Sequence, residues 1–306
     1  MITEKVSVII PTLNAGPQFH RLIELLWAQT ARPFEVIIID SSSTDGTLQT
    51  AESLGAKTIV IERPSFDHGG TRNLAAETSS GDVLVFLTQD AMPRDNMLIE
   101  NLTAPLHDPH IALSYGRQLA RPDAGTLDRF LREYRYTGEP KITDEKMLRQ
   151  FGIRAISNSN VCSAVKKFCF FEVGRFPEPS IVGEDVALAA KLVLKGYKIA
   201  YTPSAEVYHW HDYSLRQQFG RYFDIGVFFG RQKWILEHAV PDKEGLRFIR
   251  EQLACLRREG LARLIPYALL EAAAKFAAYR LGLWERYLPV SVKRRISMHS
   301  FFWKRQ

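Results

Sequence analysis

A run of five apolar residues, Val83 to Leu87, constrains the fold of this 306-residue chain more than any other stretch. Gly81-Asp82 precedes the run and Pro93 follows it, and an uninterrupted apolar run of this length predicts a strand buried on both faces. Its end changes abruptly to the polar residues Thr88-Gln89-Asp90. Ligands of an open α/β sheet bind at the carboxyl ends of the strands, so Asp90 is a candidate for holding a divalent cation. A carboxylate there can also open a turn or cap a helix, and this stretch alone leaves both interpretations open.

Strand and helix patterns alternate through the first third of the chain. They predict strands at residues 6–11, 34–40 and 57–62, and helices at 18–30, 48–54 and 71–78. This order predicts right-handed βαβ units, and hence an α/β fold with a mostly parallel sheet flanked by helices. The later patterns predict a helix ending near 106, strands at 111–115 and 198–202, a core segment at 161–173 and a helix at 186–194. Residues 121–150 show no strong periodicity, which favours a loop over the site.

Composition limits the class of protein. Hydrophobic residues at 46% and charged residues at 24% are typical of a globular chain. Three cysteines without a CxxC pair favour a reducing compartment over a disulfide framework or a structural zinc site. The N-terminus runs directly into a strand pattern and no long window lacks charge, so neither a signal peptide nor a spanning helix is predicted. The expected location is cytoplasmic, at the inner face of the cell membrane if a basic C-terminal region binds there.

Polar side chains also follow the other predicted strands. Thr12 and Asn14 follow the first strand and Asp40 ends the second, so they are expected at the same sheet edge as Asp90. The sequence contains neither a GxGxxG fingerprint nor a GxxxxGK[ST] phosphate loop. These observations together predict a mononucleotide held by scattered polar groups.

Three segments, Val8–Asn14, Val36–Thr47 and Gly69–Asn73, together resemble the nucleotide-sugar half of a family 2 glycosyltransferase of the GT-A fold. Two motifs, Phe66–Ala75 (FDHGGTRNLA) and Phe86–Ala91 (FLTQDA), are more narrowly similar to the bacterial rhamnosyltransferase subgroup. The likeness extends in ordered pieces from about residue 6 to about residue 231. It implies a GT-A type, Rossmann-like, mostly parallel sheet.

The same resemblance implies a division of the chain. Residues 1–242 are expected to form the glycosyltransferase domain, with a nucleotide-sugar half at 1–93 and an acceptor and catalytic half at 94–242. Residues 243–306, where the family motifs stop, are expected to form a helical basic extension.

Individual residues acquire roles from the resemblance. Asp40 matches the acid that contacts the base, and Arg72 matches the arginine that faces the diphosphate, for which a planar guanidinium is well suited. Asp90 matches the second acid of an Asp-x-Asp triplet, the ligand of Mg²⁺ or Mn²⁺. Thr88 replaces the first acid, which leaves the ribose contact and the metal affinity open. The residues expected to bind the nucleotide sugar are Pro11, Thr12, Asn14, Asp40, Ser42, Gly70, Arg72, Asn73, Gln89 and Arg221.

Two adjacent carboxylates, Glu184 and Asp185, follow a proline-rich loop at the start of a predicted helix. Acids at a helix start can simply complement the helix dipole. The pair also resembles the family's Glu-Asp motif, in which the aspartate is the catalytic base. An inverting transfer needs one carboxylate beside the acceptor hydroxyl, so Asp185 is expected to act as the base and Glu184 to orient the acceptor.

Two histidines and one arginine complete the set of candidates. Alternation places His209 and His211 on the same side of an extended segment. There they can complete a cation site with Asp90, donate to the diphosphate or take part in ordinary packing. Arg221 lies in a QFGRY segment that is similar to the family's Gln-x-x-Arg-Trp motif, with Tyr222 in place of tryptophan. It is expected to close over the donor.

Positive charge is concentrated at the C-terminus. Residues 243–306 hold 14 Lys and Arg against 5 Asp and Glu, a net of +9 against +6 for the whole chain, which leaves −3 for residues 1–242. A helix is predicted at 265–283, with an apolar stripe on one face and Glu271 and Lys275 on another. Aromatic and basic residues follow as far as Arg305. Two alternatives stay open: attachment to an anionic membrane surface, or packing against the catalytic domain or a second subunit in a homodimer. Nucleic acid is not expected, because no recognised nucleic-acid module accompanies the charge.

The leading hypothesis is an inverting, metal-dependent glycosyltransferase of cell-surface polysaccharide synthesis. Its expected donor is dTDP-L-rhamnose or a related nucleotide sugar, and its expected acceptor is a saccharide, free or linked to polyprenyl diphosphate. The alternatives are a glycosyltransferase that uses another donor, such as a UDP-hexose, and a non-catalytic nucleotide-binding regulator.

Overall fold

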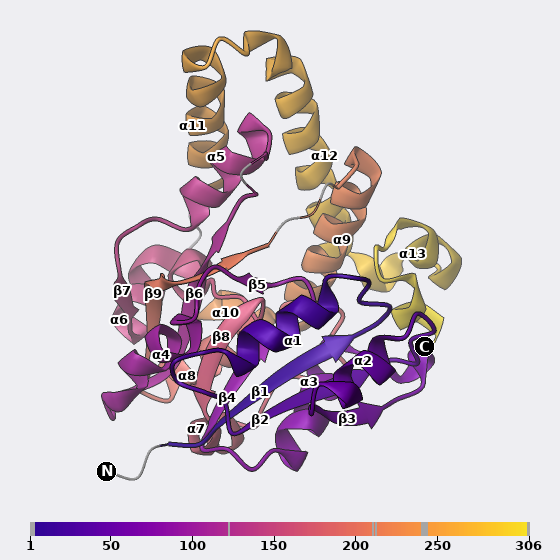
Figure 1. Ribbon diagram of the computed structural model, residues 1–306. Coiled ribbons are helices and arrows are strands. Elements are labelled where there is room, and N and C mark those ends of the chain that lie inside the picture. Colours follow the sequence, from indigo (N-terminus) through magenta and orange to yellow (C-terminus); the bar gives the residue numbers. More distant parts are fainter. Residues whose placement is uncertain (1–3, 122, 210, 212, 240–243, 305–306) are drawn as a thin grey trace.

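The computed structural model describes residues 4–121, 123–209, 211, 213–239 and 244–304 (Figure 1). Its strands are β1 (Val6–Thr12), β2 (Glu35–Asp40), β3 (Lys57–Val60), β4 (Val83–Leu87), β5 (Met92–Pro93), β6 (Ile111–Leu119), β7 (Lys141–Thr143), β8 (Cys162–Lys166) and β9 (Lys198–Tyr208). They form one sheet in the order β3–β2–β1–β4–β8–β6–β9–β5, with β7 paired to β9.

The first four strands are parallel, and β1 lies between β2 and β4. β4 matches the predicted strand residue for residue, and all of its side chains are buried. β8 pairs antiparallel with both β4 and β6, while β6 and β9 are parallel. The predicted α/β fold with a mostly parallel sheet is therefore confirmed. Antiparallel β8 at its centre lies outside what strand-helix alternation predicts.

Helices cover both faces of the sheet because side chains alternate along the buried strands. On one face Val8, Ile10 and Val85 pack under α1 (Phe19–Trp27), α2 (Thr47–Ser53) and α4 (Leu98–Thr103). On the other face Ile9 and Phe86 pack under α3 (His68–Thr78), α7 (Lys167–Glu172) and α8 (Glu184–Leu194). The sheet is thus buried on both sides, and the polar strand ends are left at one edge.

The interpretation of residues 121–150 as a loop is wrong. They form α5 (Thr126–Arg135), β7 and α6 (Glu145–Phe151). The Phe130 and Tyr134 rings of α5 pack against Phe248 at centroid distances of 5.6 and 5.1 Å. Phe248 lies on α11 (Glu244–Arg258), so α5 is stabilised by a helix more than a hundred residues away. The hydrophobic periodicity of a segment carries no information about such a distant partner.

The C-terminal helices are α9 (Leu215–Arg231), α10 (Lys233–Glu237), α11, α12 (Ile265–Leu283) and α13 (Val290–Ile296). Figure 1 shows α11 and α12 rising away from the sheet, with α12 beside α9. The bounds predicted for α12 are confirmed. Leu269 and Phe276 of the predicted apolar stripe are exposed, whereas Glu271 and Lys275 on another face are largely covered.

The proposed domain boundary at 242/243 lies outside the described residues, as does Arg305 at the end of the basic region. The two expected halves at 1–93 and 94–242 share one sheet, because β4 pairs with β8 and β5 pairs with β9. Among the helices that the structure describes, none is both long and apolar enough to cross a membrane.

Candidate active site

The nucleotide edge of the site is formed where β1 and β2 end side by side. Asp40 is 1% exposed at the end of β2. Its carboxylate accepts hydrogen bonds from Thr12 Oγ1 at 2.8 Å, from the Ser43 backbone N–H at 2.7 Å and from Ser43 Oγ at 2.6 Å. These three donors fix the orientation of the Asp40 side chain at the sheet edge.

Two loops beside Asp40 are held by side chains that the sequence singled out. Asn14 has a φ of 47°, and its Oδ1 accepts from the Thr44 backbone N–H at 2.9 Å. Gln89 is hydrogen-bonded to both backbone groups of Leu13, accepting at 2.8 Å and donating at 3.2 Å. Ser42, with a φ of 61°, donates to the Ile61 carbonyl at 2.8 Å. Of the ten residues expected to bind the nucleotide sugar, six therefore lie together at this edge: Pro11, Thr12, Asn14, Asp40, Ser42 and Gln89.

Asp90, His209 and His211 form a cluster in which one ligand atom from each lies within 4.8 Å of the others. His209 Nε2 lies 3.5 Å from Asp90 Oδ1, and His211 Nε2 lies 3.6 Å from Asp90 Oδ2. The two imidazole rings meet edge to face at a centroid distance of 4.6 Å. The predicted convergence of these three residues is confirmed, and one carboxylate with two imidazoles is a donor set that fits a divalent transition-type cation.

The orientation of the His209 ring follows from its neighbour Gln118. Arg132 Nη1 donates to Gln118 Oε1 at 2.5 Å, which identifies that atom as the amide oxygen. The same oxygen lies 3.0 Å from His209 Nδ1, so Nδ1 donates to Gln118 and Nε2 is the ring nitrogen turned toward Asp90. Burial raises the pKa of Asp90, but the hydrogen bond and charge of His209 outweigh it and lower that pKa to about 2. Burial, with the charge of His209, lowers the pKa of His211 to about 4.

The start of α3 is tied to the loop that leads into α8. Asp67 Oδ1 caps α3 by accepting from Gly69 N at 3.1 Å and Gly70 N at 2.8 Å, and it accepts from Ser180 N at 3.1 Å. A Cβ on Gly69 would come within 2.0 Å of the Pro177 carbonyl oxygen, so the close approach requires glycine. Buried Asn73 fastens the same loop, donating to the Phe176 carbonyl at 3.0 Å. Gly70 thus takes part in the cap of α3, and Asn73 takes part in fastening the loop.

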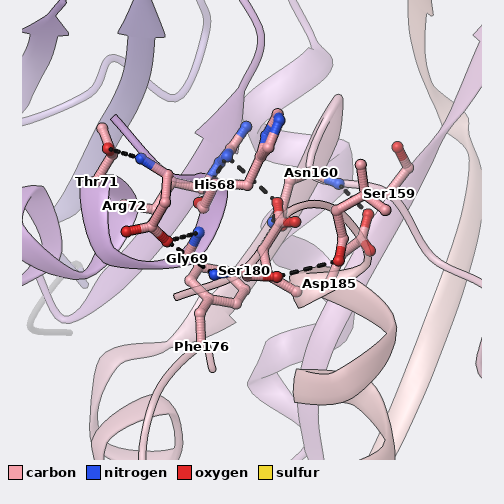
Figure 2. Close-up of polar contacts among 12 residues, drawn as sticks. His68, Gly69, Thr71, Arg72, Ser159, Asn160, Phe176, Ser180 and Asp185 are labelled. Carbon is pink, nitrogen blue, oxygen red and sulfur yellow. Dashed lines mark hydrogen bonds and ion pairs between the residues drawn. The ribbon is translucent and has the colours of Figure 1, made fainter. Parts of the chain in front are cut away.

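These attachments place the Glu184–Asp185 pair beside α3. Figure 2 shows Asp185 with Asn160 and Ser159, across from Arg72 and His68. Arg72 Nη1 lies 3.2 Å from Glu184 Oε1, and both side chains are buried. Asn160 donates from Nδ2 to Glu184 at 3.0 Å and from its backbone N–H to Asp185 Oδ2 at 3.3 Å. Arg72, expected to face the diphosphate, therefore makes its ion pair with the predicted acceptor-orienting residue.

The environment of Asp185 suits a general base. Burial and then the charge of Glu184 raise its pKa, while the backbone N–H groups of Val186 and Asn160 and the charge of Arg72 lower it. The pKa comes to about 7. A base whose pKa lies near the working pH combines a useful deprotonated fraction with useful basicity. Burial next to a like charge, with few compensating donors, is what distinguishes Asp185 from the acids of an ordinary helix start.

Besides Gln118 and Asn160, the structure adds His299, which the sequence did not single out. The Asp224 carboxylate of α9 accepts from the backbone N–H groups of Met298 and His299 at 3.0 and 3.1 Å. This fixes the His299 ring edge to face against His68, at a centroid distance of 4.8 Å. Burial, followed by neighbouring Arg72 for His68 and by His68 itself for His299, lowers both pKa values to about 3.

His68 and His299 are therefore a pair of neutral imidazoles close to the charged centre. The positive charge of Arg221, the residue expected to close over the donor, also contributes to lowering both pKa values. Its guanidinium stacks over the Tyr213 ring at 5.7 Å. His68 Nε2 is enclosed without a hydrogen-bond partner among the described residues. A neutral imidazole offers one N–H donor and one acceptor nitrogen. No motif near His299 signals this placement, because the Asp224 contact that creates it spans more than seventy residues.

Comparison with known proteins finds relatives along nearly the whole chain. The model of the family described as Glycosyl transferase family 2 matches residues 7–173. The chain is 39% identical over 302 residues to the O-antigen chain rhamnosyltransferase RfbN of Salmonella typhimurium, covering 98% of this chain and 96% of that protein. It is 38% identical over 300 residues to the O-antigen chain rhamnosyltransferase WbaN of Salmonella anatum, covering 97% and 95%.

Solved structures show the same fold. A mannosyltransferase from Pyrobaculum calidifontis in complex with GDP-Man and Mn²⁺ aligns with a TM-score of 0.58 at 21% identity, over 90% of this chain and 75% of that one. Glucosyl-3-phosphoglycerate synthase from Mycobacterium tuberculosis, in complex with Mn²⁺, UDP-glucose and phosphoglyceric acid, aligns with a TM-score of 0.54 at 18% identity, over 79% and 82%.

Proposed function

Because the chain belongs to glycosyl transferase family 2, we propose that it moves L-rhamnose from dTDP-L-rhamnose to a saccharide acceptor, with inversion at the anomeric carbon. Relatives at 38–39% identity over nearly the whole chain are named as O-antigen chain rhamnosyltransferases, which supports rhamnose and cell-surface polysaccharide synthesis. The observation that carries the catalytic assignment is the placement of Asp185, beside Glu184, Asn160 and Arg72, with its raised pKa.

In the proposed mechanism Asp185 takes the proton of an acceptor hydroxyl as that oxygen attacks the anomeric carbon. The bond from that carbon to the diphosphate breaks, and dTDP leaves on the opposite face of the sugar. Glu184 is held by Asn160 and Arg72, so its fixed carboxylate can orient the acceptor. Asp40, with Thr12 and Asn14 near it, faces the nucleoside.

Asp90, His209 and His211 are proposed to hold the cation. A divalent cation bound there would neutralise the negative charge that develops on the leaving diphosphate. Two imidazole nitrogens in the donor set favour Mn²⁺ over Mg²⁺, which prefers oxygen ligands and water. Gln118 orients His209 for this role through the bond to Nδ1.

The acceptor is proposed to carry an anionic group, as a saccharide linked to polyprenyl diphosphate does. A cavity of about 290 Å³ next to the cation cluster has four arginines among its lining residues: Arg117, Arg121, Arg129 and Arg132. Gln118 lines the same cavity and contacts His209. Guanidinium groups recognise phosphate oxygens well, which supports a phosphate-bearing acceptor.

A transfer assay with a panel of donors tests the proposed function. dTDP-L-rhamnose, UDP-glucose and GDP-mannose are offered with a lipid-linked saccharide acceptor, and nucleoside diphosphate release is measured. Preferential turnover of dTDP-L-rhamnose is expected. Preferential use of a UDP-hexose would reassign the donor, and tight nucleotide binding without turnover of any donor would support the regulator instead.

The rate of transfer is expected to rise with pH through about 7. Asp185 acts as a base in its deprotonated form, and its pKa is raised to about 7, so protonation below that value removes active enzyme. One pH unit below this pKa, kcat is expected to be about tenfold lower than its plateau. The measurement is kcat against pH at saturating substrates. A flat profile from pH 5.5 to 8 would contradict the assignment.

Replacing His299 with alanine is expected to weaken sugar binding more than nucleotide binding. If its ring bonds a sugar hydroxyl with His68, its loss costs about one hydrogen bond, or roughly 2–10-fold in kcat/KM. The binding of dTDP alone, measured by titration calorimetry, should be unchanged. His110→Ala, at an exposed position, is the control. An equal loss of dTDP affinity in His299→Ala would argue against a role specific to the sugar.

A further inference from the structure

In helix α12 the charged residues Glu271 and Lys275 face the protein and large apolar side chains are exposed, which is the reverse of an ordinary surface helix. Glu271 and Lys275 lie toward α9, where they pair at 2.5 Å with side chains only 14% and 16% exposed. Lys275 also stacks over the Tyr222 ring of α9 at 5.3 Å. The exposed residues of the helix, in contrast, are Pro266, Tyr267, Leu269, Leu270, Ala273, Phe276, Ala277 and Arg280. Seven of these eight carry no charge.

The rotation of α12 is fixed by close backbone packing. A Cβ on Gly282 would come within 2.1 Å of the Phe223 carbonyl of α9, and one on Gly226 within 2.2 Å of the Tyr279 carbonyl. Ala268 and Ala278 are buried on the same face of α12. These small residues set which face touches α9, so Phe276 at 69% exposure and Leu270 at 56% cannot turn inward without breaking the contact.

The apolar strip continues past the end of α12. Trp284 and Tyr287 are 60% and 69% exposed, and both line an open groove of about 1020 Å³ together with Phe229, Leu236 and Leu283. Arginines sit on the aromatic rings, with Arg280 over Trp284 at 5.9 Å and Arg286 over Tyr287 at 4.6 Å. Aromatic groups of this kind favour the boundary between hydrocarbon and water.

The exposed charge on residues 261–287, all of which the structure describes, is entirely positive. Arg263, Arg280 and Arg286 are exposed. The two acids of this stretch are withdrawn: Glu271 is paired with Lys275, and Glu285 is 8% exposed and paired with Arg231 and Lys293. Outside this stretch, Glu237 is an exposed acid that lines the groove together with Lys233. A surface on which apolar groups and cations outnumber anions is complementary to an anionic lipid surface.

We propose that the outer strip of α12, with Trp284 and Tyr287, lies in the interface of an anionic lipid bilayer. No described helix is long and apolar enough to span, so the attachment is parallel to the surface and reversible. The strip is different from the basic end of the chain, where Phe302 and Trp303 are 4% and 1% exposed and pack onto the catalytic body. Lipid binding is measured without turnover, so this inference stands or falls separately from the proposed donor.

The test is co-sedimentation of the full chain with vesicles of equal parts phosphatidylcholine and phosphatidylglycerol. Wild-type protein is expected to bind at low salt. Phe276→Glu and Leu270→Glu are each expected to lower the partition coefficient at least about tenfold, since each removes a large apolar group from the interface. The double variant Arg280→Gln, Arg286→Gln is expected to lower it on the order of tenfold and to weaken its salt dependence.

Phe168→Glu is the matched control, because Phe168 is 72% exposed on α7 and outside the strip. It should bind vesicles like the wild type, and all variants should keep the wild-type melting temperature. A second copy of the chain could cover the same face, and sedimentation velocity detects such a dimer. The proposal would be overturned if the wild-type protein did not bind vesicles at low salt. It would also be overturned if the wild type formed a dimer that Phe276→Glu dissociates while vesicle binding stays unchanged.

Discussion

Replacing Asp185 with asparagine is expected to lower kcat by about 10²–10⁴, the usual contribution of a general base, while dTDP binding is preserved. The amide keeps the shape of the side chain, and its one oxygen can accept from either the Asn160 or the Val186 backbone N–H group, but it cannot take the acceptor proton. Single-turnover rates with saturating donor and acceptor isolate the chemical step. Calorimetric titration with dTDP reports whether the nucleotide edge is intact.

Asp82→Asn serves as the control for this experiment, because Asp82 is an exposed acid that precedes β4 and bonds the Lys5 backbone N–H. It should leave both kcat and dTDP affinity unchanged. Transfer by Asp185→Asn within a few-fold of wild type would remove Asp185 from the mechanism. Glu184 would then be the next candidate for the base.

Replacing Asp90 with alanine is expected to abolish cation binding and with it any stimulation of transfer by Mn²⁺. Asp90 faces the Nε2 atoms of both histidines, so its loss removes the one anionic donor of the cluster. Gln118→Leu provides a graded comparison. It deletes the acceptor that holds His209 Nδ1 and is expected to weaken Mn²⁺ binding about 10–100-fold without touching a ligand atom.

Mn²⁺ affinity is measured directly, by calorimetry or electron paramagnetic resonance without substrate, so that binding and turnover are separated. His20→Ala, at an exposed helix position, is the control and should bind the cation normally. Full activity of the wild type in excess chelator, combined with absent Mn²⁺ binding, would show that the reaction uses these three side chains without a metal.

Much of the fold could be predicted because its signals are local. The apolar run Val83–Leu87 is β4 to the residue, and alternation of patterns located the other parallel strands. The carboxyl ends of parallel strands meet at one edge, which is why Asp40 and Asp90 could be grouped before any coordinates. The Asp90–His209–His211 cluster was predictable from spacing and resemblance together.

The parts that could not be predicted depend on contacts between distant segments. Gln118 meets His209 from 91 positions away, and Asn160 meets Glu184 from 24 positions away. His299 joins the site through a contact made on α9, whose sequence pattern indicates only a helix. The orientation of α12 has the same origin. Small glycine and alanine residues form its contact with α9, so its larger apolar side chains lie on the exposed face.

The position of β8 has a consequence for folding. Until residues 162–166 dock, β4 is an edge strand with five apolar side chains and a free row of backbone groups. The pairing of Leu84 with Val165 closes a long loop, so it is expected to form later than the parallel pairs of the N-terminal region. An intermediate built from β1 to β4 alone would present a short, uncharged, β-prone segment to other chains. The aggregation hazard of this protein is thus concentrated in the strand that carries Asp90 to the site.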